Sequence, residues 1–266
     1  MKRCQLSKLA IASAVAAILA AASPAYAGFF AVDTASDELF SVDATTGAGT
    51  LVGSLGSGVY ENLAFDSAGT LYQIRNSTDQ LLTIDTATAA TTVVVNLSAS
   101  NDSGGMAFDS NDTLYAIQQS LNQLVTIDIT TGLQTVIGSL GFNDVRSLAI
   151  DSNDQLFAVS TDTDQLLSID TTTGAATAIG STGTPAITGL AFDDNDVLFG
   201  VDVATDQLVT VDTSTGVSTN VGALGFGSPA GLAFQSAAES VPEPAGLGIM
   251  GFALAGFVFR RRASAR

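Results

Sequence analysis

The sequence predicts an all-β fold, a five-bladed β-propeller whose four-stranded blades are about 42 residues long. Three observations predict it. One pattern of four short segments recurs five times, each segment alternates apolar and polar residues between turn-forming residues, and no helical period appears between residues 28 and 236. A unit of this length has the size of a propeller blade, whereas the rungs of a β-solenoid are much shorter.

The four recurring segments predict four strands per blade, which we name a to d in chain order. Strand a is expected at residues 63–66, 106–109, 148–151, 190–193 and 232–235. Strand b is expected at residues 29–32, 71–74, 114–117, 156–159 and 198–201. Strand c is expected within residues 37–43, 79–85, 122–128, 164–170 and 206–212. Strand d is expected at residues 50–53, 92–95, 135–138, 177–180 and 219–222.

The phase of the repeat predicts how the ring closes. The body begins with a strand b at residues 29–32 and ends with a lone strand a at residues 232–235. Five whole blades result only when these two segments pair, which also removes two exposed sheet edges. In its L-A-F-D, L-Y-A-V-like and Q-L-x-T-I-D runs, the unit resembles propeller repeats of the NHL and YWTD type. That resemblance implies a fold and not a function.

Charge is distributed unevenly along the chain. The 266 residues include nine basic and 26 acidic residues, and seven of the basic residues lie in the two termini. Residues 28–241 contain 25 acidic residues, two arginines and no lysine, a net charge of −23. A body with this much negative charge repels nucleic acid and anionic membranes. We therefore expect neither of them as its partner. The simplest role of these charges is to keep the surface solvated.

The first 27 residues predict a secretory signal peptide. A basic start precedes an apolar run at residues 9–22, and residues 25–27 read Ala-Tyr-Ala, a cleavage site of the A-x-A type. Gly28 would then be the new N-terminus. Cys4 is the only cysteine and would leave with the peptide, so the body can form no internal disulfide.

The last 30 residues predict a second removable signal. Its parts are the motif Pro242, Glu243 and Pro244, an apolar stretch at residues 245–259, and a basic cluster of Arg260, Arg261 and Arg262. The stretch is shorter than the roughly 20 residues of a full membrane span, and the arginines would hold its far end in the cytoplasm. In order and spacing, these parts resemble the PEP-CTERM sorting signal of Gram-negative bacteria.

The PEP-CTERM resemblance implies a route for the protein. It implies processing by an exosortase-type membrane protease, transient anchoring in the inner membrane, and release to the cell surface or medium, often alongside exopolysaccharide. We therefore expect a signal peptide at residues 1–27, a propeller domain at residues 28–236 and a sorting signal at residues 237–266, with its basic tail at residues 260–266. The resemblance implies nothing about the function of residues 28–236.

The chain contains no histidine. This excludes Ser-His and Cys-His nucleophiles and histidine-ligated zinc or iron. Propeller enzymes that resemble streptogramin lyases rely on histidine and are excluded on the same ground. A glycosidase needs only two carboxyl groups and stays open, although no Asp or Glu pair departs clearly from the repeat. We expect no enzyme and no cofactor.

The turns between strands a and b offer a calcium alternative. Asp109-Ser-Asn-Asp112 and its relatives carry oxygen ligands at alternating positions, as calcium loops do. The fifth and sixth positions, however, lack the ligand and the glycine of an EF-hand. The favoured interpretation is a tight turn in which Asp and Asn side chains bond their own backbone, and the c–d turns are interpreted in the same way.

The loops between strands b and c and between strands d and a vary most among the repeats. They should share one face of the ring, which we name the variable face, and variation on a regular scaffold is typical of binding loops. The candidate ligand-binding residues are Asp33, Arg75, Gln118 and Asp202 after strand b, Glu61 and Arg146 before strand a, and the aromatics Tyr60, Phe142 and Phe226. The alternative is local charge pairing, of Glu61 with Arg75 and of Arg146 with Asp144 or Asp162.

Three functions stay in competition. The first is a non-catalytic protein of the cell surface or extracellular matrix, associated with exopolysaccharide. The second is a lectin-like propeller that binds a glycan on the variable face. The third is a polysaccharide hydrolase or lyase, which the missing histidine disfavours.

Overall fold

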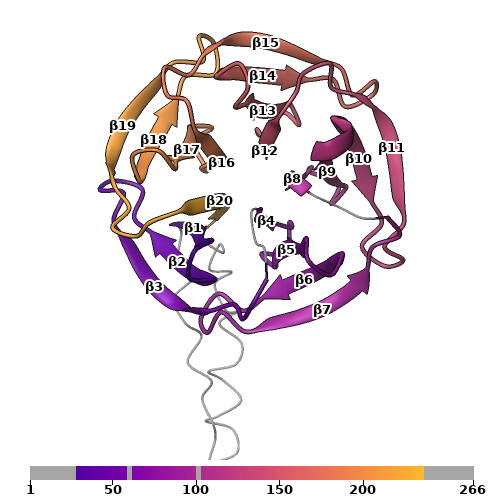
Figure 1. Ribbon diagram of the computed structural model, residues 1–266, viewed down its shortest axis with the longest axis horizontal. Coiled ribbons are helices and arrows are strands. Elements are labelled where there is room, and N and C mark those ends of the chain that lie inside the picture. The colour runs from indigo at the N-terminus through magenta and orange to yellow at the C-terminus, as the bar shows by residue number, and fades with distance from the viewer. Residues whose placement is uncertain (1–27, 59–61, 100–102, 237–266) are drawn as a thin grey trace, which may run out of the picture.

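The protein is a ring of five four-stranded antiparallel sheets around a central axis (Figure 1). In this computed structural model, the described residues are 28–58, 62–99 and 103–236. Apart from the strands they contain a single short 3-10 helix, η1 (Gln119–Leu121). The predicted all-β fold and five-bladed propeller are confirmed.

The four strand positions run from the axis to the rim (Figure 1). The a strands are β4 (Ala64–Phe65), β8 (Ser103–Phe108), β12 (Val145–Ile150), β16 (Ile187–Phe192) and β20 (Pro229–Gln235). The b strands are β1 (Gly28–Asp33), β5 (Leu71–Arg75), β9 (Leu114–Gln118), β13 (Leu156–Ser160) and β17 (Leu198–Asp202). The c strands are β2 (Glu38–Val42), β6 (Gln80–Ile84), β10 (Gln123–Ile127), β14 (Gln165–Ile169) and β18 (Gln207–Val211). The d strands are β3 (Gly49–Ser54), β7 (Thr91–Asn96), β11 (Gln134–Ser139), β15 (Ala176–Ser181) and β19 (Ser218–Ala223).

The ring closes by pairing the two ends of the body. β20 is hydrogen-bonded to β1, with Phe29 opposite Phe234 and Ala31 opposite Leu232. The first blade therefore has the strand order β20-β1-β2-β3, and blades 2 to 5 follow in chain order. Gly28 lies opposite Gln235, so both ends of the body lie on the face that carries the a–b turns. The predicted closure is confirmed.

The hydrophobic core consists of five layers, one between each pair of neighbouring blades. Successive side chains of a strand point to opposite faces of its sheet. In β1, Phe29 and Ala31 pack into the layer with blade 5, whereas Phe30 and Val32 pack into the layer with blade 2. Each sheet therefore buries both faces, which explains why every residue of β1 is buried.

The c–d turns hold the outer parts of the blades together. In each turn an Asp side chain accepts backbone N–H groups two and three residues on, as Asp170 does from Thr172 and Thr173 at 2.7 and 3.1 Å. The last turn residue has a positive φ and is a glycine in every blade except blade 2, which has Ala89 at +60°. In blade 4 it is Gly174 at +78°, which lies against Gly138 in strand d of the preceding blade. These contacts bear out the Asx-turn interpretation of the c–d turns.

The a–b turns add a second link, which we name the Asp–Ser clasp. The fourth turn residue is an Asp with positive φ, and its carboxylate accepts the backbone N–H and the hydroxyl of a Ser in the preceding blade. The three clasps are Ser67–Asp112, Ser110–Asp154 and Ser152–Asp196, with bonds of 2.5 to 2.9 Å. Blade 1 has no a–b turn because its strands a and b come from opposite ends of the body. Among the described residues, the three clasps link blades 2 to 5.

The glycine contact between blades 3 and 4 predicts a stability defect. A Cβ at Gly138 would lie 2.0 Å from the carbonyl oxygen of Thr173. We expect Gly138→Ala to lower the free energy of unfolding by about 1–3 kcal/mol, as overpacking does, measured by thermal or urea denaturation. Gly227→Ala is the matched control, because nothing lies within 4 Å of its Cβ position. Equal stability of the two variants would contradict the tight contact.

The clasps predict a component of acid sensitivity. The Ser110 hydroxyl and backbone N–H lower the pKa of Asp154, and Ser67 and Ser152 do the same for the pKa of Asp112 and Asp196. A carboxyl group with a lowered folded pKa stabilises the protein above its unfolded pKa of about 3.9 and loses that contribution as the pH falls through the folded pKa. The triple Asp→Asn variant should therefore show a smaller fall in melting temperature between neutral pH and pH 2. An unchanged pH profile would show that the clasps do not stabilise the ring.

Candidate functional site

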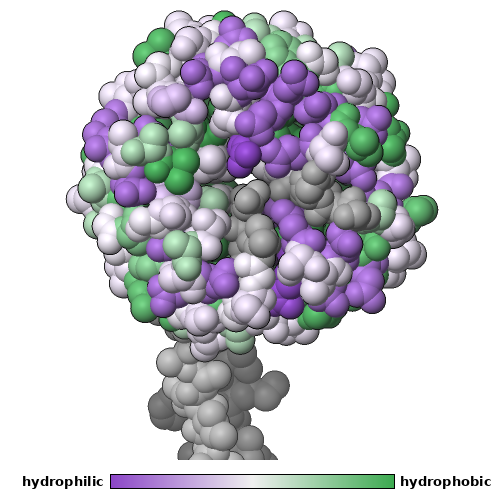
Figure 2. All heavy atoms as spheres, in the orientation of Figure 1, coloured by the Kyte–Doolittle hydropathy of each residue, from purple (hydrophilic) through white to green (hydrophobic). Residues whose placement is uncertain are grey.

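The variable face has a small cavity where the central channel opens. It measures about 150 Å³, and its lining includes Gly104, Arg146, Thr188 and Ala230, each two residues before the L-A-F-D-like run of its blade. These positions are equivalent in the repeat but carry different residues, and the structure brings them together around the axis. Figure 2 shows this face, with hydrophilic side chains gathered over β12 and β13 beside its centre.

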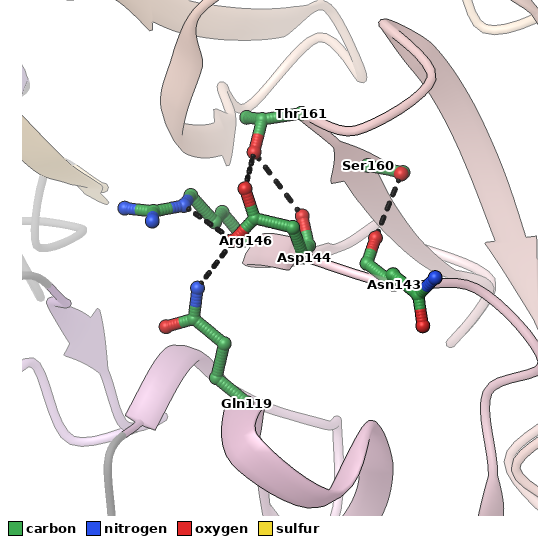
Figure 3. Close-up of polar contacts among 6 residues, drawn as sticks. All are labelled: Gln119, Asn143, Asp144, Arg146, Ser160 and Thr161. Atoms are coloured by element: carbon green, nitrogen blue, oxygen red, sulfur yellow. Dashed lines mark hydrogen bonds and ion pairs between the residues drawn. The ribbon is translucent and has the colours of Figure 1, made fainter.

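A polar cluster stands beside this cavity at the boundary of blades 3 and 4 (Figure 3). Asp144 accepts hydrogen bonds from the Thr161 hydroxyl at 2.5 Å, from Nε2 of Gln119 at 2.6 Å and from Nε of Arg146 at 3.0 Å. Gln119 comes from η1, Thr161 follows β13, and Arg146 lies in β12. Arg146 keeps 35% of its side chain exposed and lines the cavity.

The electrostatics of this cluster favour an ion pair. Burial alone would raise the pKa of Asp144, but the hydrogen bonds from Thr161 and Gln119 and the neighbouring Arg146 guanidinium outweigh it and lower that pKa. Asp144 therefore stays ionised at neutral pH. The expected pairing of Arg146 with Asp144 is confirmed, and the guanidinium is oriented by a carboxylate that is itself held by two further donors.

The candidates at the end of strand b lie deeper than the sequence suggested. Asp33 and Asp202 are buried and cap the following b–c turns, since Asp33 accepts the N–H of Ala35 and Asp202 the N–H of Ala204. Gln118 is buried and donates to Gln134 at 2.7 Å. Arg75 is half-buried at the end of β5, and the cavity lining does not include it. A ligand-binding role for these four residues stays a prediction.

Two of the three aromatic candidates pack against the hydrophobic core, and the third lies outside the described residues. Phe226 is buried and stacks on Phe40 with ring centroids 4.0 Å apart, between blades 5 and 1. Phe142 is half-buried against the layer between blades 3 and 4. Tyr60 and Glu61 lie outside the described residues, and so does the expected Glu61–Arg75 pairing.

Sequence reasoning missed a constriction of the central channel. The residues just before the L-A-F-D-like runs meet around the axis and are small or tightly packed: Asn62, Gly105, Ser147, Gly189 and Gly231. A Cβ on Gly105 would lie 2.4 Å from the carbonyl carbon of Ser147. The space left is about 10 Å³, room for about one water molecule. The constriction therefore separates the two faces of the ring.

The a–b turns hold their carboxylates in local bonds. Asp109 accepts the N–H groups of Asn111 and Thr113, at 3.0 and 2.7 Å, and Asp151 and Asp193 repeat the pattern. Within residues 28–58, 62–99 and 103–236, no three acidic side chains gather closely enough to hold a metal ion. These bonds bear out the turn interpretation, and calcium stays an untested alternative.

The predicted signals at the two ends lie outside the described residues, which include neither residues 1–27 nor residues 237–266. In the part of the chain that the structure describes, no helix has the length and apolar character of a membrane span.

Comparisons with known sequence families match two parts of the chain. Residues 29–146 match a family described as a repeat of unknown function, DUF6923. Residues 240–262 match the PEP-CTERM protein-sorting motif. No curated protein matches the sequence significantly.

Solved structures match the body at the level of fold. A structural genomics protein of unknown function from Bacteroides thetaiotaomicron is 13% identical, with a TM-score of 0.56 over 79% of this chain and 65% of that chain. A chain in a nidogen/laminin complex is 14% identical, with a TM-score of 0.55 over 78% of this chain and 84% of that one. Virginiamycin B lyase from Staphylococcus aureus is 14% identical, with a TM-score of 0.49 over 80% of this chain and 78% of the lyase.

Identities this low show the fold alone. The sorting motif indicates the cellular route of the protein, because this motif marks exported proteins that an exosortase processes. The chain thus joins a five-bladed β-propeller to a PEP-CTERM sorting motif, as an exported protein of Gram-negative bacteria.

Proposed function

We propose that the processed protein is a non-catalytic component of the cell surface or extracellular matrix, held there by association with exopolysaccharide. The observation that carries the non-catalytic part of the proposal is that the carboxylates are held in structural hydrogen bonds. The repeated Asp side chains described above cap turns or form clasps. Asp144, in the non-repeated cluster, has a lowered pKa, whereas a carboxyl group that acts as a general acid near neutral pH needs a raised one.

The geometry of the chain ends supports a display role. Residues 237–266 follow Ser236, at the face with the a–b turns, and the sorting motif is in that segment. The variable face is at the opposite end of the ring. We infer that a protein anchored through its C-terminal segment presents the variable face away from the membrane. We also infer that the mature form runs from Gly28 to about Val241, between the two removable signals.

A lectin-like activity on the variable face is the second candidate, and a specific observation favours it. The cluster of Asp144, Arg146, Gln119 and Thr161 combines a fixed guanidinium with hydroxyl and amide groups at the edge of a cavity of about 150 Å³. That volume is below the usual range for an enclosed ligand. It suits one sugar ring or one acidic substituent of a longer glycan that lies across the face.

The matrix role predicts where the protein is found. Fractionated cultures of the producing bacterium should contain it with the exopolysaccharide, and a strain that makes no polysaccharide should release it into the medium. Replacing Pro242, Glu243 and Pro244 by alanine should leave it with the inner membrane, because the processing motif is lost. An unchanged distribution in the polysaccharide-free strain would contradict the association.

The lectin-like role predicts an unequal effect of the two arginines. Arg146→Ala should weaken binding to the producer's polysaccharide about tenfold, since a charge-assisted hydrogen bond contributes roughly 1.5–3 kcal/mol. Arg75→Ala should weaken binding less than Arg146→Ala, because the cavity lining does not include Arg75. Asp144→Asn should give an intermediate loss, because the guanidinium keeps its place with a weaker partner. Binding of unchanged strength in Arg146→Ala would contradict a glycan site at this cavity.

A further inference from the structure

The opposite face of the ring contains a larger cavity, which we name the axial bowl. It measures about 800 Å³ and lies inside the circle of a–b turns. The channel constriction separates it from the cavity of the variable face. Its volume falls within the range of small-molecule sites, and neither the turn interpretation nor the sorting motif gives it a task.

The bowl has an apolar floor made of one side chain from each blade. The five residues are Phe65, Phe108, Ile150, Phe192 and Phe234, and all are half-buried. The phenyl rings are held from behind by aromatic residues of strand b. Tyr72 contacts Phe108 with ring centroids 5.1 Å apart, and Phe157 contacts Phe192 at 5.5 Å. The floor is therefore aromatic and preorganised in four of its five positions, with Ile150 in the fifth, and it is open to the solvent on one side.

The wall of the bowl is acidic. Asp66, Asp109, Asp151 and Asp193 supply the first residue of each a–b turn, and Asp194 adds a carboxylate where the other blades carry serine. The lining contains no lysine and no arginine. The apolar floor has a low dielectric constant, and such a surface focuses the electric field of these carboxylates into the cavity.

Floor and wall together select one class of occupant. An aromatic ring attracts a cation to its face, and quaternary ammonium groups are the ligands that aromatic cages recognise. A neutral apolar ligand would leave the wall unused. A small hydrated metal ion would leave the floor unused, and no three acidic side chains of the described residues gather to ligate one.

We propose that the axial bowl binds a small organic cation, with an ammonium group over the ring of Phe108, Phe192 and their equivalents and the aspartates around it. The apolar part of such a ligand contacts the floor, and its charge is balanced by the wall. This site is independent of the glycan site on the variable face.

The experiment uses the purified processed protein and phenyltrimethylammonium as the probe, followed by calorimetry or ligand-observed NMR. Choline and its uncharged carbon isostere, 3,3-dimethylbutan-1-ol, test the need for charge. We expect phenyltrimethylammonium and choline to bind and the isostere not to bind. Raising the salt concentration should weaken binding, because the charged wall is open to solvent.

Two substitutions toward the residues of sister blades test the site without endangering the fold. Asp194→Ser installs the residue of the other a–b turns and should weaken binding about three- to tenfold. Ile150→Phe completes the aromatic ring and should tighten binding by a similar factor. Asp212→Asn is the matched control, since Asp212 caps a c–d turn outside the bowl, and should change nothing.

Three results would overturn the proposal. Equal binding of choline and its neutral isostere would exclude a cation site. Equal loss in Asp194→Ser and Asp212→Asn would indicate general attraction to an acidic protein. Displacement of the probe by millimolar calcium, with no response to Ile150→Phe, would indicate an ion site at the turns instead of recognition by the aromatic floor.

Discussion

Packing of sheet against sheet is the interaction on which the rest of this structure depends. Each blade is apolar on both faces, so it is stable only between two neighbours. The pairing of β20 with β1 supplies the last neighbour, because it completes blade 1 from the two ends of the body. Phe29 and Phe234, 5.0 Å apart between ring centroids, are packed together only by this closure. The ring is therefore a single cooperative unit although its chain is a row of repeats.

The polar composition of the body follows from the same packing. Neighbouring blades approach closely at the rim, where a glycine in strand d meets the c–d turn of the next blade, as Gly222 meets Thr46. The turns need aspartate to bond their backbone, and the clasps need aspartate again. Much of the large negative charge is thus a consequence of turn chemistry repeated around the ring. Its concentration around the axial bowl follows because the a–b turns encircle the axis.

The two faces of the ring differ in how they use the repeat. On the face with the a–b turns, equivalent residues make equivalent contacts, and the near-symmetry builds a bowl. On the variable face, equivalent positions carry different residues, and Arg146 and Asp144 form an ion pair from a combination of residue types that the sequence does not repeat at the equivalent positions. The constriction near Gly105 and Ser147 keeps these two environments apart. One scaffold can therefore carry two sites with opposite preferences for charge.

The sequence by itself determined the strands, their fivefold repeat, the closure of the ring and the Asx turns, because each depends on local periodicity or on the phase of the chain. It also named Asp144, two residues away, as one of two possible partners of Arg146, beside Asp162. Only the tertiary structure decided that Asp33 and Asp202 are buried turn caps, since burial depends on the neighbouring loops. Three further features cross blade boundaries: the hydrogen bond from Gln119 to Asp144, the clasps and the aromatic floor. They could not be predicted, because the pattern within one repeat does not give the distance between neighbouring sheets. Gln73 marks the same limit: strand periodicity places it, but only packing shows that its amide is fully buried without a hydrogen-bond partner, where β9 and β13 carry alanine.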